Sequence, residues 1–312
     1  MGIILKSSKA MDKAYRKTSS FLGVVGLILL ANCCKAQLNP YQAIYFENRY
    51  LVNPAMAALD KGLTLNLAYQ RQWIPFPGAP TMQAATFEYQ ATEKMGLGLN
   101  VNDEQSGLFR QTRLMGTYAY HLPLSDENQK LNFGLSLGVG DSRINYSDVV
   151  GDLTDIELSQ YNQKGPYVDA DVGISYTSDN LFVEGVVPNL NTNLFNRDNQ
   201  RADVDRTVFL TAISYKIMFS DDANDFTLEP LAALRAIKGF NDIGDLGLNF
   251  RMPAYHLDLH TIYHTNDNWG LGFTLDEPTY AINFNYNIYQ GPISNSANGA
   301  FEFGLKLRLF NK

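Results

Sequence analysis

Hydrophobic and polar residues alternate with a period of two along most of the chain beyond residue 61. In KLNFGLSLGVG, residues 130–140, the odd positions from 131 carry Leu, Phe or Val and the even positions from 132 carry Asn, Gly or Ser. TYAINFNYNIY, residues 279–289, repeats the pattern with Tyr, Ile and Phe opposite Ala and Asn. Successive side chains of a β-strand point to opposite faces, so this period predicts strands with one apolar face and one small, polar face.

About fourteen segments meet this alternation criterion, and most of them have nine residues or more. A strand of a globular protein usually has about 5–6 residues, whereas a tilted strand that crosses a membrane needs about 9–11. Apolar side chains toward lipid and polar ones toward a lumen are typical of outer-membrane barrels. The sequence therefore predicts an all-β fold, a transmembrane antiparallel β-barrel of about fourteen strands over residues 62–312. The expected strands are 62–73, 80–91, 95–103, 109–122, 130–143, 166–178, 180–188, 205–219, 225–237, 243–252, 255–265, 268–276, 279–289 and 299–310.

The connections between these strands alternate in length, as a barrel with both termini in the periplasm requires. The fifth, seventh, ninth and thirteenth connections are mostly long, and the second, sixth, tenth and twelfth are short. The fourth (PLSDENQK) and the eleventh (NDN) do not fit. At the start of the first connection, Trp73 lies where the expected strand 62–73 ends, as interfacial aromatic residues do. The proline-rich run that follows it, residues 75–80, predicts an external loop.

The first 36 residues read as a secretory signal peptide. Five basic residues precede the apolar run 21–31, and Ala36 is a small residue before Gln37. That run is shorter than the roughly 20 residues of a membrane-spanning helix, and Asn32 fits poorly before a lipoprotein cysteine at position 33 or 34. The start codon is either Met1 or Met11.

Residues 37–61 precede the barrel and are too few for a domain. YQAIYFENRY, residues 41–50, is compatible with a short helix that ends near Asn53, because Pro54 disfavours helical geometry in the residue before it. Two placements fit this segment: a plug inside the lumen, or a position on the periplasmic side.

Composition and charge narrow the class of protein. Of the 312 residues, 18% are charged and 12% are aromatic, which is fewer charges than the roughly 25% of soluble domains. Without residues 1–36, the chain has 19 basic and 31 acidic residues, a net charge of −12, and no cysteine. We therefore expect no disulfides and, since no basic stripe is present, no nucleic-acid partner.

Four patterns raise the question of chemistry, and none predicts a catalytic, cofactor or metal site. His256, His260 and His264 recur every four residues in an alternating strand, where that step spans about 13 Å, too far for two of them to share a zinc ion. With Asp258 they are expected to form a polar row facing the lumen. The acidic residues of 148–157 lack EF-hand spacing, the glycine-rich runs lie within strands, and no Gly-x-Ser-x-Gly elbow is present. We expect neither an enzyme nor a cofactor.

Several motifs, in order, closely resemble the PorP/SprF family of type IX secretion-system outer-membrane proteins. They are YLVNPAMAAL, LAYQRQWIPFPGAPTMQAATFE and MGLGLNVNDEQSGLFRQTRLMGTYAYHLPL, followed by KLNFGLSLGVG. The similarity covers residues 40–150, and the alternating remainder is compatible with it. Unlike many barrels that finish on an aromatic residue, this chain continues past Phe310 with Asn311 and Lys312. The motif residues taken as partner-binding candidates are Asn53, Pro54, Arg71, Trp73, Pro77, Gly78, Ala79, Pro80 and Arg110.

The resemblance implies an outer-membrane barrel, set in outer-membrane lipid, that serves type IX secretion or gliding motility. Relatives similar to PorP associate with the secretion machinery and its periplasmic lipoproteins; relatives similar to SprF help to export, or anchor, a secreted protein with a C-terminal sorting domain. On this basis we expect the loops around 74–79, 144–165 and 188–204 to bind the secreted partner and residues 37–61 to serve the periplasmic or luminal side. The alternatives are a passive porin or hydrophobic-solute channel, and a soluble secreted β-protein.

Overall fold

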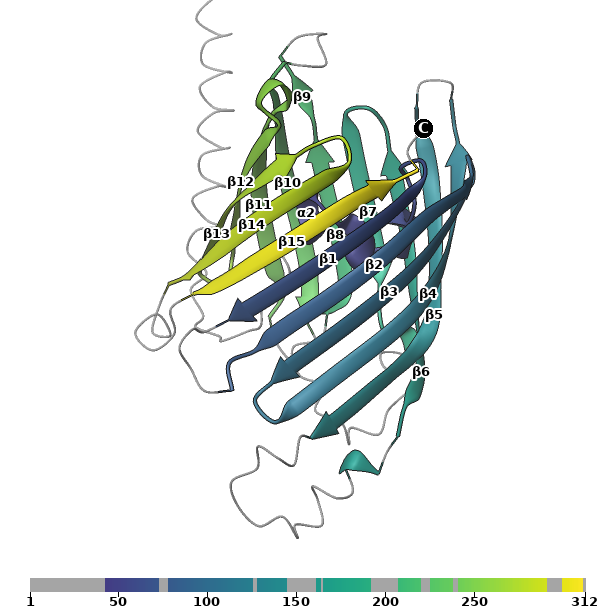
Figure 1. The fold of residues 1–312 in the computed structure, drawn as a ribbon, viewed down its shortest axis with the longest axis vertical. Helices are drawn as coiled ribbons and strands as arrows, with labels where there is room; N and C mark the ends of the chain where they lie inside the picture. Colours follow the sequence, from purple (N-terminus) through teal and green to yellow (C-terminus); the bar gives the residue numbers. More distant parts are fainter. Residues whose placement is uncertain are drawn as a thin grey trace, which may run out of the picture. The chain divides into compact units, whose positions relative to one another are not determined.

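The computed structural model describes residues 43–72, 78–125, 128–144, 161–163, 165–191, 207–219, 225–237, 241–290 and 299–310. Fourteen antiparallel strands form a closed ring, because each strand pairs with its neighbours in the sequence and β15 pairs with β1 (Figure 1). The short β9 continues β8 beyond Lys216 and pairs with β10. The predicted barrel of about fourteen strands is therefore confirmed. The strands are β1 (Leu63–Gln72), β2 (Thr81–Thr92), β3 (Met95–Ser106), β4 (Phe109–Pro123), β5 (Lys130–Ile144), β6 (Tyr167–Thr177), β7 (Leu181–Val187), β8 (Thr207–Tyr215), β9 (Ile217–Met218), β10 (Thr227–Ile237), β11 (Ile243–Met252), β12 (Leu257–His264), β13 (Asn268–Asp276), β14 (Tyr280–Tyr289) and β15 (Ala300–Leu309).

The two faces of the wall are those that the alternation predicts. On β5, Leu135 and Leu137 are exposed, whereas Asn132 and Ser136 are buried. Large apolar side chains are exposed in the same way on nearly every strand, while buried Asn, Thr, Ser, Asp and Glu side chains occupy the alternate positions. The arrangement is the reverse of a water-soluble core and suits a barrel whose outer face meets lipid.

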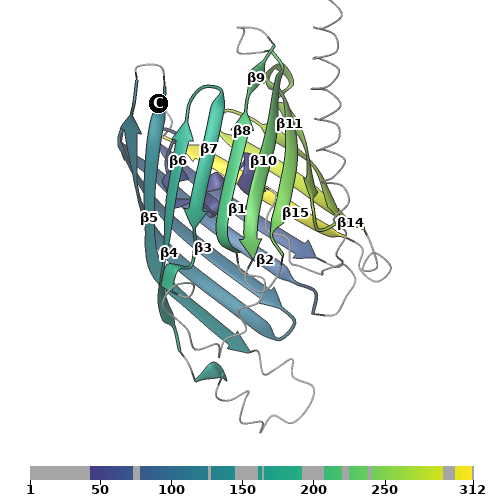
Figure 2. The ribbon, with the colours of Figure 1, turned by 180° about the vertical axis from the view of Figure 1, so that it is seen from behind.

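The ring has two distinct ends. One end, here called the C-terminal end of the barrel, is where β15 finishes and where the short turns that follow β2, β6, β11 and β13 lie. The strands β5 and β7 end, and β6 and β8 begin, at the opposite end, which is here called the long-loop end because the connections between them are long (Figure 2). At that end β3, β4 and β5 extend beyond β13, β14 and β15 (Figure 1).

In the part of the chain that the structure describes, three short helical turns precede β1: α2 (Ala43–Phe46), η1 (Arg49–Leu51) and η2 (Pro54–Met56). A further turn, η5 (Pro253–Tyr255), joins β11 to β12. None of the described helices is long and apolar enough to cross a membrane. The short helix expected within 41–50 is present in part: in the described residues α2 ends at Phe46, and the separate turn η1 follows from Arg49. Between them the carbonyl of Glu47 accepts a hydrogen bond from Lys306 of the wall instead of continuing the helix.

Candidate functional site in the barrel lumen

The N-terminal segment, residues 43–59, contacts inward-facing side chains on most sides of the ring. Asn48 donates to Thr86 Oγ1 at 3.2 Å, and the amide of Ala58 donates to Glu88 at 2.9 Å. On the other side, Thr274 donates to Glu47 at 2.8 Å. The strands that bond to the segment are β2, β3, β4, β6, β7, β8, β10, β11, β13 and β15.

The first anchor of the segment is a buried ionic group around Asp245. Arg235 donates to its two carboxylate oxygens at 2.7 and 3.0 Å, and His264 Nδ1 lies 2.6 Å from Oδ1. Tyr45 donates its hydroxyl to the same carboxylate. Burial raises the pKa of Tyr45 well above its ordinary value, so the hydroxyl keeps the proton that it donates. A fully buried guanidinium and carboxylate require this degree of pairing, because an unpaired buried charge is costly.

The second anchor is Arg49, which lies in η1. Its guanidinium pairs with Glu229 at 2.7 Å and donates to Ser214 at 3.2 Å. It also lies 3.6 Å from the ring centroid of Phe182, in cation–π geometry. One side chain thus joins the segment to β7, β8 and β10.

Asn53 and Tyr50 form the third anchor. Asn53 donates to Glu184 at 2.8 Å, and its side-chain oxygen accepts from the amide of Ala55 at 3.0 Å, which caps η2. Tyr50 donates to Thr117 at 2.8 Å, and burial raises the pKa of Tyr50 above its usual range. Pro54, at the first position of η2, lacks only an N–H that would have no helical partner there.

Apolar contacts also hold the N-terminal segment against the inner wall. Ile44 and Leu51 pack in one buried cluster with inward-facing wall residues. The expectation that the lumen is lined by small and polar residues is therefore incomplete, because a patch of its wall is apolar where the segment packs against it. The wall residues of this cluster are Ala84, Val186, Leu210, Ala212, Leu231 and Ile262.

Glycines on the inner face leave room for the segment. A Cβ atom on Gly134 would fall on the backbone at Pro54 and Ala55, and one on Gly173 would collide with Asn53. The small residues seen in the alternation thus have a steric role: a side chain at these positions would occupy the space that the segment fills.

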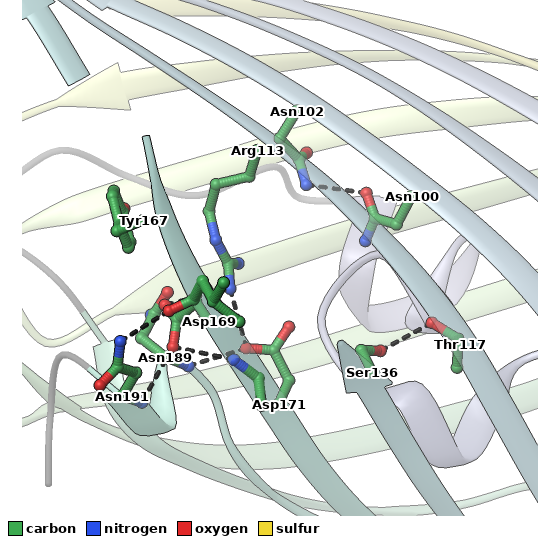
Figure 3. Close-up of polar contacts among 12 residues, drawn as sticks. Asn100, Asn102, Arg113, Thr117, Ser136, Tyr167, Asp169, Asp171, Asn189 and Asn191 are labelled. Atoms are coloured by element: carbon green, nitrogen blue, oxygen red, sulfur yellow. Dashed lines mark hydrogen bonds and ion pairs between the residues drawn. The ribbon is translucent and has the colours of Figure 1, made fainter. Parts of the chain in front are cut away.

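The chain that leaves β7 also folds against the inner wall. Asp169 and Asp171 lie on β6 beside Arg113, which is 3.0 Å from Asp171 (Figure 3). Asp171 accepts from the amide of Asn189 at 2.7 Å, and Asp169 accepts from the amide of Asn191 at 3.0 Å. The described start of the 188–204 loop is therefore fixed inside the barrel.

The candidate residues from the family motifs do not form one site. Asn53 and Pro54 lie in the lumen, whereas Arg71 and Arg110 are exposed at the long-loop end. Gly78, Ala79 and Pro80 lie at that end too: Gly78 adopts φ of 72° and accepts from Gly107, and Pro80 accepts from Gln72. Trp73 and Pro77 lie outside the described residues, as do residues 37–42, 74–76, 145–160, 164 and 192–204 of the expected binding segments.

The histidine row is correct in part. Asp258, His260 and His264 are buried on the inner face of β12. His256 does not belong to the row: it lies in the turn before β12 with φ of 52°, exposed, and makes a hydrogen bond with the carbonyl of Asp276. The expected strand, 255–265, began two residues before β12, because η5 still includes Tyr255. Within the described ranges no three His, Cys, Asp or Glu side chains come together as a metal site.

Sequence reasoning did not identify the wall residues that hold the segment, chiefly Glu184, Glu229, Arg235 and Asp245. Each is a charged residue at an inward position of an alternating strand. That was the available signal, but alternation does not say what an inward charge contacts.

The match to a family model decides the relationship. The model of the "Type IX secretion system membrane protein PorP/SprF" family matches residues 34–307. The chain belongs to the PorP/SprF family. The resemblance read from the motifs of residues 40–150 is confirmed and extends over most of the chain. Family and fold support an outer-membrane location and point to a non-enzymatic role in type IX secretion.

No curated protein matches the chain. Among solved structures, the chain is similar to the outer-membrane protein Omp33 of Acinetobacter baumannii, with 8% identity, a TM-score of 0.45, and coverage of 81% of this chain and 100% of that one. It is also similar to the toluene transporter TbuX of Ralstonia pickettii, with 9% identity, a TM-score of 0.48, and coverage of 89% and 95%. Likenesses of this degree carry no information on what this chain binds or transports.

Proposed function

We propose that this PorP/SprF protein is an outer-membrane barrel with a blocked lumen, and that it serves type IX secretion by binding other proteins. In this proposal residues 37–61 form a luminal plug, and the loops at the long-loop end hold a secreted protein with a C-terminal sorting domain. The single observation that supports a blocked lumen is the set of contacts between residues 43–59 and inward side chains of ten strands. In this proposal the long-loop end faces outward, since an even strand number puts both termini at one end and the short turns of outer-membrane barrels lie on the periplasmic side.

Two deletions separate the plug from the binding loop. Removing residues 145–160 leaves Asn162 and Ile144 in place, which exchange hydrogen bonds of 2.8 and 2.9 Å at the end of β5. We expect this variant to insert and to be silent in a planar bilayer, but to lose surface retention of the secreted protein. Removing residues 43–59 is expected to give a steady ion current, because barrels larger than about eight strands leave a lumen when unfilled.

The competing function is a passive porin or hydrophobic-solute channel. A steady current through the full-length chain would favour that function and contradict the plug. Retention of the partner by the variant without 145–160 would exclude that loop as its binding site, and the same measurement would then be made on 192–204. The periplasmic side is tested by capture of the secretion-system lipoproteins with the full-length chain.

A further inference from the structure

One row of outward-facing residues changes from apolar to charged as it passes around the barrel. Because barrel strands are tilted by about 35–45°, a row of directly paired residues is inclined to the membrane plane and crosses its boundary. The change occurs at Arg71, which pairs with Phe301 on one side and with Thr81 on the other. From β13 to β5 the row consists of Leu271, Tyr286, Phe301, Arg71, Thr81, Gln105, Arg110 and Arg143.

Two arginines end this row beside each other. Arg110 on β4 pairs directly with Arg143 on β5, and their side chains are 61% and 67% exposed. Four residues toward the membrane on the same strands, Leu114 and Val139 are exposed apolar residues. At about 3.3 Å per residue and a tilt of about 40°, the arginines lie roughly 10 Å beyond this last aliphatic row. A flexible arginine side chain there reaches the headgroup layer.

The contacts that both guanidinium groups make with other described residues do not use all of their N–H donors. Arg110 Nε donates to Asp103 at 2.9 Å, and Arg143 Nε pairs with Asp141. Asp103 also accepts from Thr112 at 2.6 Å, which fixes the carboxylate. A guanidinium has five N–H donors, so each side chain has donors beyond these contacts with the described residues. Like charges directly opposite in a sheet are unfavourable. Asp103 and Asp141 each offset part of this repulsion, and an anion between the two guanidinium groups would offset more of it.

We propose that Arg110 and Arg143 bind the phosphate of an anionic lipid headgroup in the leaflet at the long-loop end. A planar guanidinium fork matches a phosphate, and two forks on adjacent strands address one group from both sides. A lipid fits better than a soluble anion because both side chains face outward, just beyond the apolar belt. The inference does not depend on the secreted partner or on the plug.

The test is native mass spectrometry of the folded full-length protein, titrated with phosphatidylglycerol, phosphatidylcholine or inorganic phosphate. The variant R110Q/R143Q is compared with K94Q/K130Q, which removes the same charge at the C-terminal end of the barrel. We expect phosphatidylglycerol to bind at least about tenfold more weakly to R110Q/R143Q, which corresponds to one lost charge-assisted hydrogen bond. K94Q/K130Q should bind phosphatidylglycerol as well as the wild type does, and D103N should bind it as well as the wild type or better.

Three results would overturn the proposal. Equal weakening in both double variants would mean non-specific charge attraction. Binding of inorganic phosphate that competes with phosphatidylglycerol at the same concentration would mean a site for soluble anions. Unchanged lipid binding by R110Q/R143Q together with reduced retention of the secreted protein would assign the arginines to the protein partner.

Discussion

The inner and outer faces of the barrel wall use the same residue types for opposite purposes. On the inner face, Gly134 leaves space that the N-terminal segment fills, whereas on the outer face Gly116 has only Leu137 O near a hypothetical Cβ, at 3.8 Å. Asp245 inside is fully buried with three partners, while Asp103 outside supports an exposed arginine. The residue type alone does not set the contribution to stability; the face on which it lies does.

The largest expected effect is that of Asp245→Asn. The substitution removes the charge that neutralises Arg235, whose side chain is 2% exposed, and breaking a buried pair costs about 3–5 kcal/mol. We expect the free energy of unfolding to fall by that amount in urea titrations read by the heat-modifiable mobility of folded barrels. A loss below about 1 kcal/mol, the level of a surface pair, would mean that water reaches this group and that the inner face does not exclude it.

Gly134→Ala sharpens the comparison with the smallest possible side chain. The new methyl group would meet backbone of the segment, which cannot rotate away, and overpacking of this kind costs about 1–3 kcal/mol. We expect lower stability and intermittent ion current in planar bilayers as the segment is displaced. The matched control is Gly116→Ala on the outer face of β4, which should remain silent and as stable as the wild type. Equal behaviour of the two variants would show that the segment does not depend on this contact.

The barrel was predictable from the sequence because lipid and lumen impose a period of two on every strand. The fourteen strands were found with most ends within a few residues, and the largest differences have local causes. The expected strand 205–219 divides at Lys216, and 95–103 continues to Ser106 because β3 pairs with a β4 that extends beyond the apolar belt. Strand order alone assigns each connection to one of the two ends, so the loop lengths in the sequence predicted which end carries the long loops.

The contacts that hold the N-terminal segment in the lumen were not predictable in the same way. Its contacts join residues far apart in the chain, such as Tyr45 with Asp245 and Asn53 with Glu184. Nothing in a single sequence reports which inward charge lies opposite which residue of the segment. Asn53 and Pro54 belong to a family motif, whereas their partners on the wall carry no motif.

Tyr50→Phe tests a single hydrogen bond on the inner face. The hydroxyl donates to Thr117, which also shares a hydrogen bond with Ser136, so Thr117 keeps one partner after the change. We expect a loss of about 0.5–1.5 kcal/mol in the free energy of unfolding. Tyr118→Phe is the control, because Tyr118 is the next residue of β4 and is exposed on the outer face. A larger loss for Tyr118→Phe would contradict the assignment of faces.

The smallest effect is expected for Asp103→Asn, the outer counterpart of Asp245→Asn. Arg110 is mostly exposed, so the lost pair is screened and worth about 0–1 kcal/mol. The unfolding midpoint in urea should barely move, while the freed guanidinium binds an anionic headgroup at least as well as before. The two aspartates have the same chemistry and each pairs with an arginine of the adjacent strand. If their substitutions destabilised the barrel equally, burial would not be the cause of the difference between the faces, and the inner ionic group would lose its role as the anchor of the segment.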